Sequence, residues 1–275
     1  MNKDIFFSIN ICCYNSSKFI KESIESILKQ SFKDWEIVII NDGSTDNTEK
    51  IIFDYINSGY PIKYFYQKNA GYASARNKAI DLSEGKWIVI LDHDDLCEED
   101  RLANHHKEII NNKNLKFFFG NCVYFNENEY LTNKFEMFKK QFSKNLIDLN
   151  YNKYFCSNNL VRYGCFIPSS TVVFNKEIAI KINGFNENYR FNSDYDFFFR
   201  FSLIEDIYCS NKTFCFWRSH SNQSQNKYKI KMNWELNRFY SSIYFNNKIN
   251  IFTKIILFFK QKLMFIKQIY YLFKN

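Results

Sequence analysis

The sequence predicts an α/β protein with a Rossmann-like, mostly parallel central sheet flanked by helices, followed by a helical extension at the C-terminus. Two patterns lead to this fold class. Between residues 6 and 91, short apolar runs rich in β-branched residues alternate with segments whose apolar residues recur at helical spacing. After residue 246, apolar residues dominate and polar positions return every seven residues, which is about two helical turns. With 275 residues and 46% hydrophobic content, the chain can bury a large core.

The first β–α–β unit is expected within residues 6–40. Residues 6–13 are an apolar run of strand length, and residues 35–40 are a second one. The helix expected between them, over residues 16–30, has four apolar residues on one face: Ile20, Ile24, Ile27 and Leu28. Because both strands are apolar on both faces, we expect them to be buried and parallel.

The same alternation continues to residue 91. Residues 41–46 are rich in turn-forming side chains and supply a capping residue for a helix over 47–56. A third strand is expected over 62–66, a third helix over 71–82 and a fourth strand over 87–91. This order of elements implies right-handed crossovers between parallel strands.

Three carboxylates, Asp92, Asp94 and Asp95, follow directly on the predicted strand 87–91. They lie at the carboxyl end of that strand, where open α/β sheets bind their ligands. Acids so close together repel one another unless a cation lies among them, and their hard oxygens suit Mg²⁺ or Mn²⁺. A metal held there can in turn hold a diphosphate. The alternative is an acidic, helix-capping loop, because residues 98–100 are also acidic.

The basic excess of the chain is concentrated at its C-terminal end. The net charge is +8, and residues from 227 onward include ten Lys or Arg but a single acid, Glu235. This excess suggests acidic partners such as phosphates or anionic lipid. The rest of the chain is nearly balanced, so no nucleic-acid partner is expected.

Cysteine spacing and the N-terminus indicate the cellular compartment. None of the eight cysteines forms a CxxC pair, so neither a zinc site nor a disulfide framework is expected. Asp4 and Asn10 interrupt the first apolar run, which argues against a signal peptide. No uncharged run approaches the ~18 to 20 residues that span a bilayer. We expect a cytoplasmic protein, either free or peripheral on the inner face of the cytoplasmic membrane.

Taken in order, several segments resemble the bacterial family 2 glycosyltransferases, inverting enzymes with the fold called GT-A. The resemblance covers residues 5–100 closely and 165–225 more loosely, and Asp92-His93-Asp94 corresponds to the DXD motif of such enzymes. One departure is the Cys12-Cys13 pair, where the family commonly has Pro or a small polar residue. The segments that carry the resemblance are 8–15, 34–46, 69–71, 75–77 and 91–95.

The resemblance implies roles for five residues of the first half. Tyr14 and Asp42 would hold the nucleobase by stacking and by a hydrogen bond, and Arg76 would lie near the base or the diphosphate. Asp92 would bind a ribose hydroxyl, while Asp94 would bind the Mn²⁺ or Mg²⁺ ion. Read alone, Asp42 is a turn residue that bonds its own loop, and Arg76 is a surface helix charge. Their joint placement at strand ends favours the binding roles.

Inverting transfer also needs a general base that deprotonates the acceptor hydroxyl. Residues 184–187 are similar to the Gly-Phe-Asp-Glu turn that precedes this base in the family, and Ser193-Asp194 replaces the usual Glu-Asp pair. The resemblance therefore assigns the base to Asp194. Asp196 is the rival, although an acid in the first turn of a helix is also favoured by the helix dipole. Arg200 is expected to form an ion pair on that helix.

Residues 217–224 resemble the Arg-x-His segment of the family. Imidazole can complete a Mn²⁺ site, so His220 is expected to contact the metal or the diphosphate. The alternative is a loop histidine bonded to the backbone.

The resemblance implies a GT-A domain over residues 1–225, with a nucleotide-binding half over 1–115 and an acceptor half over 116–225. The implied reaction moves a single sugar from a nucleotide-sugar, most simply a UDP-sugar, to a saccharide or lipid-linked acceptor. Such a transferase would serve the biosynthesis of cell-surface polysaccharide, lipooligosaccharide or another glycan. The alternative is a catalytically inactive relative that binds glycans or is recruited to a membrane.

The remaining segment, residues 226–275, is predicted to be the helical extension. Its polar positions recur as 246/247, 253/254, 260/261, 267/268 and 274/275, which forms a narrow stripe with four lysines. A helix with a broad apolar face and a lysine stripe can lie in the headgroup region of an anionic membrane. The alternative is a terminal helix that packs on the catalytic domain or on a second subunit in a homo-oligomer.

Overall fold

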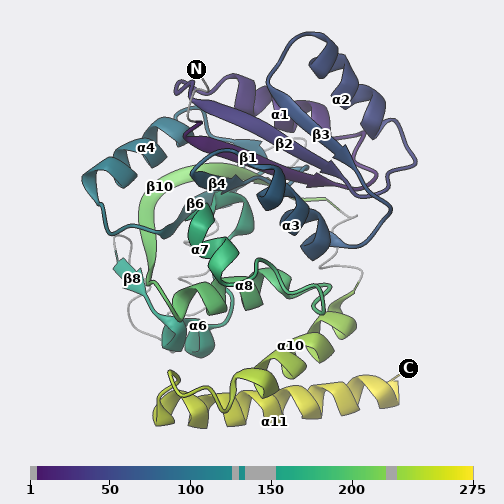
Figure 1. Cartoon of the computed structure of the whole chain (residues 1–275). Coiled ribbons are helices and arrows are strands. Elements are labelled where there is room, and N and C mark those ends of the chain that lie inside the picture. The colour runs from purple at the N-terminus through teal and green to yellow at the C-terminus, as the bar shows by residue number, and fades with distance from the viewer. Residues whose placement is uncertain (1–4, 126–129, 134–152, 221–227, 275) are drawn as a thin grey trace.

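The computed structural model describes residues 5–125, 130–133, 153–220 and 228–274. One mixed sheet of ten strands runs through the molecule, with helices on both of its faces (Figure 1). Its main path has the strand order β3-β2-β1-β4-β9-β6-β10-β5, and β7 and β8 pair at the sides with β6 and β10. The predicted α/β class with a central sheet flanked by helices is confirmed.

The first half of the sheet is parallel. It consists of β1 (Phe7–Cys13), β2 (Trp35–Asn41), β3 (Ile62–Tyr66) and β4 (Trp87–Ile90). Helix α1 (Ile20–Leu28) and α2 (Thr48–Asn57) bury their apolar residues on one face, together with α4 (Arg101–Asn111). Helix α3 (Tyr72–Leu82) covers the other face. These elements confirm the predicted strands and helices of residues 6–91.

The second half introduces antiparallel pairing. The short strand β9 (Val173–Asn175) lies between β4 and β6 (Phe117–Phe125) and is antiparallel to both. Strand β10 (Ile207–Arg218) then runs parallel to β6. The remaining strands are short: β5 (Leu96–Cys97), β7 (Tyr130–Asn133) and β8 (Lys153–Phe155).

Four further helical segments lie around β9 and β10: α6 (Ser157–Tyr163), η1 (Ser169–Thr171), α7 (Lys176–Lys181) and α8 (Ser193–Ser202). Helix α8 is anchored by a run of buried aromatic rings, which include Phe197, Phe198 and Phe201. The ring of Phe197 stacks on Phe185 at a centroid distance of 4.1 Å. Because such rings bury large apolar areas, they fix the position of the helix and therefore of its N-terminal turn.

All eight cysteines are free thiols in the structure, and six of them are buried. Their burial makes them part of the core.

The C-terminal extension is a helical hairpin of α10 (Lys229–Ile243) and α11 (Ile251–Lys274) at the bottom of Figure 1. Two residues of the polar stripe of α11, Thr253 and Lys260, face the protein. Thr253 is buried and accepts a hydrogen bond from Arg162 Nε (3.1 Å), and Lys260 Nζ donates to the Val161 carbonyl (2.8 Å). The physical reason is that the last turn of α6 leaves carbonyl groups without intrahelical partners.

Large apolar residues cover the outward side of α11. Within the part of the chain that the structure describes, no helix is both long and apolar enough to cross a membrane.

Candidate active site

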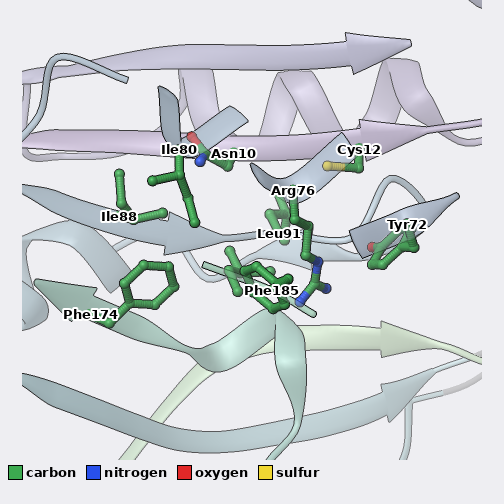
Figure 2. A pocket seen from close by; sticks show the side chains of 10 residues that line it. Asn10, Cys12, Tyr72, Arg76, Ile80, Ile88, Leu91, Phe174 and Phe185 are labelled. Atoms are coloured by element: carbon green, nitrogen blue, oxygen red, sulfur yellow. The ribbon is translucent and has the colours of Figure 1, made fainter. Parts of the chain in front are cut away.

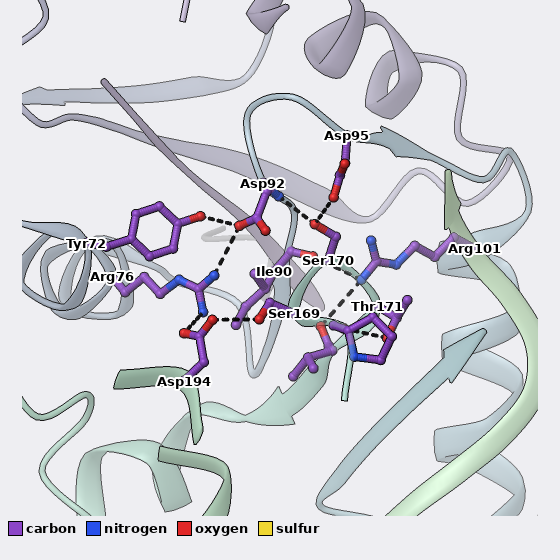
Figure 3. Close-up of polar contacts among 12 residues, drawn as sticks. Tyr72, Arg76, Ile90, Asp92, Asp95, Arg101, Ser169, Ser170, Thr171 and Asp194 are labelled. Carbon is purple, nitrogen blue, oxygen red and sulfur yellow. Dashed lines mark hydrogen bonds and ion pairs between the residues drawn. The ribbon is translucent and has the colours of Figure 1, made fainter. Parts of the chain in front are cut away.

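The polar side chains expected to act together meet at one edge of the sheet. The loops after β1, β2 and β4 end there, because the carboxyl ends of parallel strands lie on the same edge. The N-terminus of α8 and the end of β10 reach the same place from the second half of the chain. Figure 3 shows Arg76 between Asp92 and Asp194, with Tyr72 and Ser169 beside them.

Arg76 is the centre of this cluster. Its side chain is only 3% exposed, and its guanidinium donates to Asp194 Oδ1 at 2.5 Å and to Asp92 Oδ1 at 3.1 Å. The rings of Tyr72 and Phe185 lie 4.4 and 5.2 Å from it. Burial by itself lowers the pKa of Arg76, but the nearby carboxylates outweigh it and raise the pKa. Arg76 is therefore a buried link between two acids, and the alternative of a surface helix charge does not hold.

Figure 2 shows what lies behind this guanidinium. Arg76 borders a small, mostly apolar pocket whose wall includes Ile80, Phe174 and Phe185. Cys12 lines the same pocket, and burial raises the pKa of its thiol far above the ordinary value. Cys12 is therefore a neutral wall residue at physiological pH.

Asp92 accepts hydrogen bonds on one oxygen. The Tyr72 hydroxyl and Arg76 both donate to Oδ1, and the Asp92 backbone N–H donates to Ser170 Oγ at 3.1 Å. Figure 3 shows these contacts as one connected network.

Asp194 begins the second half of the cluster, in the first turn of α8. Ser169 Oγ donates to its Oδ2 at 2.6 Å, while Arg76 occupies Oδ1. Burial raises the pKa of Asp194 above its ordinary value, and Arg76 and Ser169 offset only part of that effect. A carboxylate with a raised pKa on a side chain that is 26% exposed has the properties of a general base.

Asp196, the rival acid, has a different environment. Its carboxylate forms an ion pair with Arg200 at 2.7 Å, and Arg200 also donates to the carbonyls of Ile182 and Gly184. These contacts fix α8 to the preceding turn, as expected for a helix-face ion pair.

The structure also brings together the two residues expected to bind metal. His220 Nε2 lies 2.8 Å from Asp94 Oδ2, although the two residues are 126 positions apart in the chain. The imidazole packs beside Phe19, with ring centroids 4.8 Å apart. No third His, Cys, Asp or Glu side chain completes a metal-binding group with them among the described residues.

An imidazole nitrogen and a carboxylate oxygen suit Mn²⁺ or Mg²⁺, which commonly takes its other ligands from water and substrate phosphates. The pair therefore fits the expected metal. Nε2 is the ring nitrogen of His220 that faces Asp94. The other ring nitrogen, Nδ1, is buried and has no hydrogen-bond partner among the described residues.

Asp95 and Arg218 hold the loop that carries Asp94. Asp95 is fully buried and accepts hydrogen bonds from Ser170 Oγ and from the Arg218 backbone N–H at 2.9 Å. Burial and the charges of Asp94 and Asp92 raise the pKa of Asp95 well above its ordinary value. Arg218 Nε donates to the Asp94 carbonyl at 2.8 Å. Through these hydrogen bonds, Asp95 and Arg218 hold the loop of Asp94 against the end of β10.

Asp42 joins two loops. Its carboxylate accepts from Gln67 Nε2 at 2.7 Å, from the Ala70 backbone N–H at 2.9 Å and from the Gly71 backbone N–H at 3.0 Å. Its structural role is therefore to fix the loop before α3, so the turn-residue alternative holds in part. Tyr14, which directly follows β1, is 50% exposed.

Tyr72 was not predicted from the sequence, although it directly follows the Asn69-Ala70-Gly71 segment. Arg218 is the arginine of the Arg-x-His segment, for which the resemblance implied no role of its own. Residues 126–129 and 134–152 of the expected acceptor half, and residues 221–224 of the His220 segment, lie outside the described residues.

Comparison with known proteins identifies the family of this chain. A family model described as "Glycosyl transferase family 2" matches residues 8–182. An uncharacterized glycosyltransferase of Rickettsia typhi is 31% identical over 224 residues, which cover 80% of this chain and 65% of that protein. This chain thus spans about two thirds of the length of that relative. A β-1,3-glucosyltransferase of Escherichia coli, named for UDP-Glc and α-D-GlcNAc-diphosphoundecaprenol, is 29% identical over 85% of both chains.

Two solved structures share the fold. S. aureus TarS (residues 1–349) in complex with UDP-GlcNAc has a TM-score of 0.68 at 18% identity, covering 92% of this chain and 70% of that chain. The mannosyltransferase PcManGT from Pyrobaculum calidifontis, in complex with GDP-Man and Mn²⁺, has a TM-score of 0.68 at 17% identity, covering 95% and 70%. The chain therefore belongs to glycosyl transferase family 2 and has the GT-A fold that its sequence predicts.

Proposed function

We propose that this protein is an inverting, metal-dependent glycosyltransferase that moves a single sugar from a UDP-sugar to a saccharide or lipid-linked acceptor. The observation that carries the proposal is the meeting of Asp94 with His220, and of Arg76 with Asp194, at the ligand-binding edge of the sheet. The activity for which the E. coli relative is named supports a UDP-sugar and a lipid-linked acceptor in cell-surface glycan biosynthesis.

Asp94 and His220 would hold Mn²⁺ or Mg²⁺. The bound ion would offset the charge that develops on the leaving diphosphate.

Asp194 would act as the general base. It would accept the proton of the acceptor hydroxyl while that oxygen attacks the anomeric carbon on the face opposite the diphosphate, which inverts the configuration. Ser169 and Arg76 orient the carboxylate by holding one oxygen each. A positioned base of this kind contributes about 10²- to 10⁴-fold to the rate.

The nucleoside would bind between the first-half loops. The exposed ring of Tyr14 would stack on the base, and Asp42 would accept one further hydrogen bond from the base while it holds the loop before α3. Asp92 would bind a ribose hydroxyl through Oδ2, since the contacts from Tyr72 and Arg76 both fall on Oδ1.

The first experiment is thermal melting with UDP, GDP, TDP or CMP, each in Mn²⁺ and in EDTA. A ligand that binds the native state raises the melting temperature by mass action. We expect a shift with UDP that disappears in EDTA. A shift with another nucleotide would keep the enzyme class and change the donor. No shift with any nucleotide would favour the alternative, a catalytically inactive relative that binds glycans or partners.

With this function we infer a cytoplasmic protein that is peripheral on the inner face of the cytoplasmic membrane. A lipid-linked acceptor presents its sugar at that surface. Residues 246–275 would provide the contact with the membrane. The alternative is that this helix packs on a second subunit in a homo-oligomer.

A further inference from the structure

The outward side of α11 is an apolar face made of Phe252, Ile255, Phe259, Leu263 and Ile266. These residues follow one another at intervals of three and four, which places them on one side of the helix. Each is between 49% and 61% exposed. A contiguous apolar face of this kind marks a surface that contacts a partner or a membrane.

The opposite side of α11 shows that this orientation is specific. Lys260 points inward to the Val161 carbonyl and lies near the Tyr240 ring, and burial lowers the pKa of its amine to about 8. Gln261 donates to Ser241 on α10. Lys260 and Gln261 thus contact the rest of the protein, while the apolar face of α11 is exposed, which is unusual for a surface helix.

Both helices of the hairpin carry exposed basic side chains, which an anionic surface attracts. Residues 227–275 include ten basic residues, and Lys229, Lys231 and Lys262 are exposed. Their single acid, Glu235, accepts hydrogen bonds from three backbone N–H groups. Its charge is therefore directed into the protein.

We propose that the apolar face of α11 docks on the surface of an anionic bilayer, with the exposed lysines of the hairpin at the headgroups. The proposal names the surface that would make the peripheral membrane contact, and it rests on the proposed function. Each apolar side chain that enters the headgroup boundary adds binding free energy in proportion to its buried area, and each nearby lysine adds electrostatic attraction.

The test is flotation of the full chain with vesicles of phosphatidylglycerol and phosphatidylcholine, without nucleotide. We expect the wild type to float with the vesicles, and the double variant Ile255→Glu/Leu263→Glu to lose at least roughly tenfold in binding. The matched control is Ile110→Glu on α4, which is 56% exposed and carries the same chemical change. Equal flotation of the double variant and the wild type would overturn the proposal.

A second copy of the chain is the competing occupant. If a second copy covers the face, sedimentation velocity without lipid would show a dimer, and Ile255→Glu/Leu263→Glu would dissociate it. That result would also overturn membrane docking. Failure of the proposed transferase would appear separately, as loss of UDP stabilisation in a protein that still floats.

A different observation carries a second inference. The Glu235 carboxylate on α10 accepts from three successive backbone N–H groups: Arg190 at 2.5 Å, Phe191 at 2.7 Å and Asn192 at 2.7 Å. The Asn192 side chain adds a fourth bond at 3.0 Å. Asn192 is the residue from which α8 begins, two positions before Asp194.

The geometry points to Glu235 as a positioning residue for Asp194. The three N–H groups lie in the turn that sets where α8 starts, so the carboxylate fixes the first turn of that helix. A charged acceptor makes stronger hydrogen bonds than a neutral one, which suits a residue that must hold a catalytic group within a fraction of an ångström. This inference rests on the proposed role of Asp194.

The variant Glu235→Gln tests it, because it removes the charge and one acceptor oxygen. The reaction is hydrolysis of UDP-glucose or UDP-N-acetylglucosamine, with water as the acceptor and released UDP as the readout. We expect kcat to fall by roughly 10- to 100-fold, while the KM for donor and the stabilisation by UDP with Mn²⁺ stay unchanged. The control Glu177→Gln removes an exposed carboxylate from α7 and should retain the wild-type kcat.

An unchanged kcat in a normally folded Glu235→Gln protein would overturn the positioning role, as would equal changes in kcat and in UDP binding. If Glu235→Gln does not melt cooperatively, kcat and KM for donor hydrolysis are measured on Glu235→Asp instead. It keeps the charge and shortens the reach by one methylene group. A wild type without turnover would instead count against the proposed function.

Discussion

At the scale of single residues, the two expected metal ligands give the most direct test. Asp94→Asn should abolish the Mn²⁺-dependent rise in melting temperature with UDP, because a neutral amide is a weaker ligand for a hard cation. Asp81→Asn, an exposed acid on α3, is the control and should keep the full shift. An Asp94→Asn protein that still responds to UDP in Mn²⁺ and not in EDTA would place the metal elsewhere.

Substitution of Asp194 and substitution of Asp196 should have different effects on kcat and on the melting temperature. Asp194→Asn should keep the UDP-dependent thermal shift and lose about 10²- to 10⁴-fold in kcat for donor hydrolysis, because the proton acceptor is gone. Asp196→Asn removes the partner of Arg200, so it should lower the melting temperature and retain most turnover. The reverse pattern would transfer the base to Asp196.

The pH dependence of kcat should report the environment of Asp194. Its pKa is raised by burial, so the catalytically active carboxylate is lost as pH falls through a value above the ordinary Asp value of about 3.9. Arg76 is the main group that lowers this pKa, while Asp92 raises it. Arg76→Met should therefore move the acidic limb to higher pH, and Arg200→Met should leave it in place. A wild-type limb at or below about pH 4 would contradict this assignment.

At the scale of elements, the sequence predicts the first half well and the second half poorly. The four parallel strands and three helices up to residue 90 match because each is a clear apolar run or an amphipathic repeat. Strand β9 has three residues and pairs on both sides with distant strands, so no local pattern reveals it. Among the site residues, Asp94 and His220 were expected near the metal and do lie together.

Other site contacts could not be predicted, because they depend on tertiary packing. Ser169 and Ser170 carry no local signal, and they reach Asp194 and Asp95 only through the insertion of β9 between β4 and β6. The bonds of Asp42 to the loop before α3 arise in the same way, since they join residues about 25 to 29 positions apart.

The inward lysine of α11 has a measurable effect on stability. The amine of Lys260 has a pKa of about 8 in the fold and a normal value near 10.5 when unfolded, so the unfolded chain binds more protons between these values. Stability should therefore rise as pH increases from about 8 toward 10.5. Lys260→Met should stabilise the protein by about 1 to 2 kcal/mol at pH 7 by removing the buried charge.

Chemical denaturation at pH 7 and pH 10 checks this prediction. The control Lys262→Met changes an exposed lysine two positions away and should alter the free energy of unfolding little. A Lys260→Met protein that is less stable than the wild type at pH 7 would show that the bond to the Val161 carbonyl outweighs the cost of burying the charge.

At the scale of the whole molecule, each functional pair joins the two halves of the chain. Arg76 comes from the first half and Asp194 from the second, and the same holds for Asp94 and His220. The sheet is continuous across the expected division near residue 115, through β4, β9 and β6. The two halves are therefore parts of one continuous sheet, and the candidate site lies at one edge of it.

The guanidinium of Arg76, which contacts both Asp92 and Asp194, would couple donor binding to the strength of the base. A donor that draws Arg76 closer to Asp92 loosens its hold on Asp194, and the free energy exchanged is the same in both directions. Asp194 then has a higher affinity for protons when the donor is in place than when it is absent. The base would therefore gain strength only once there is a sugar to transfer.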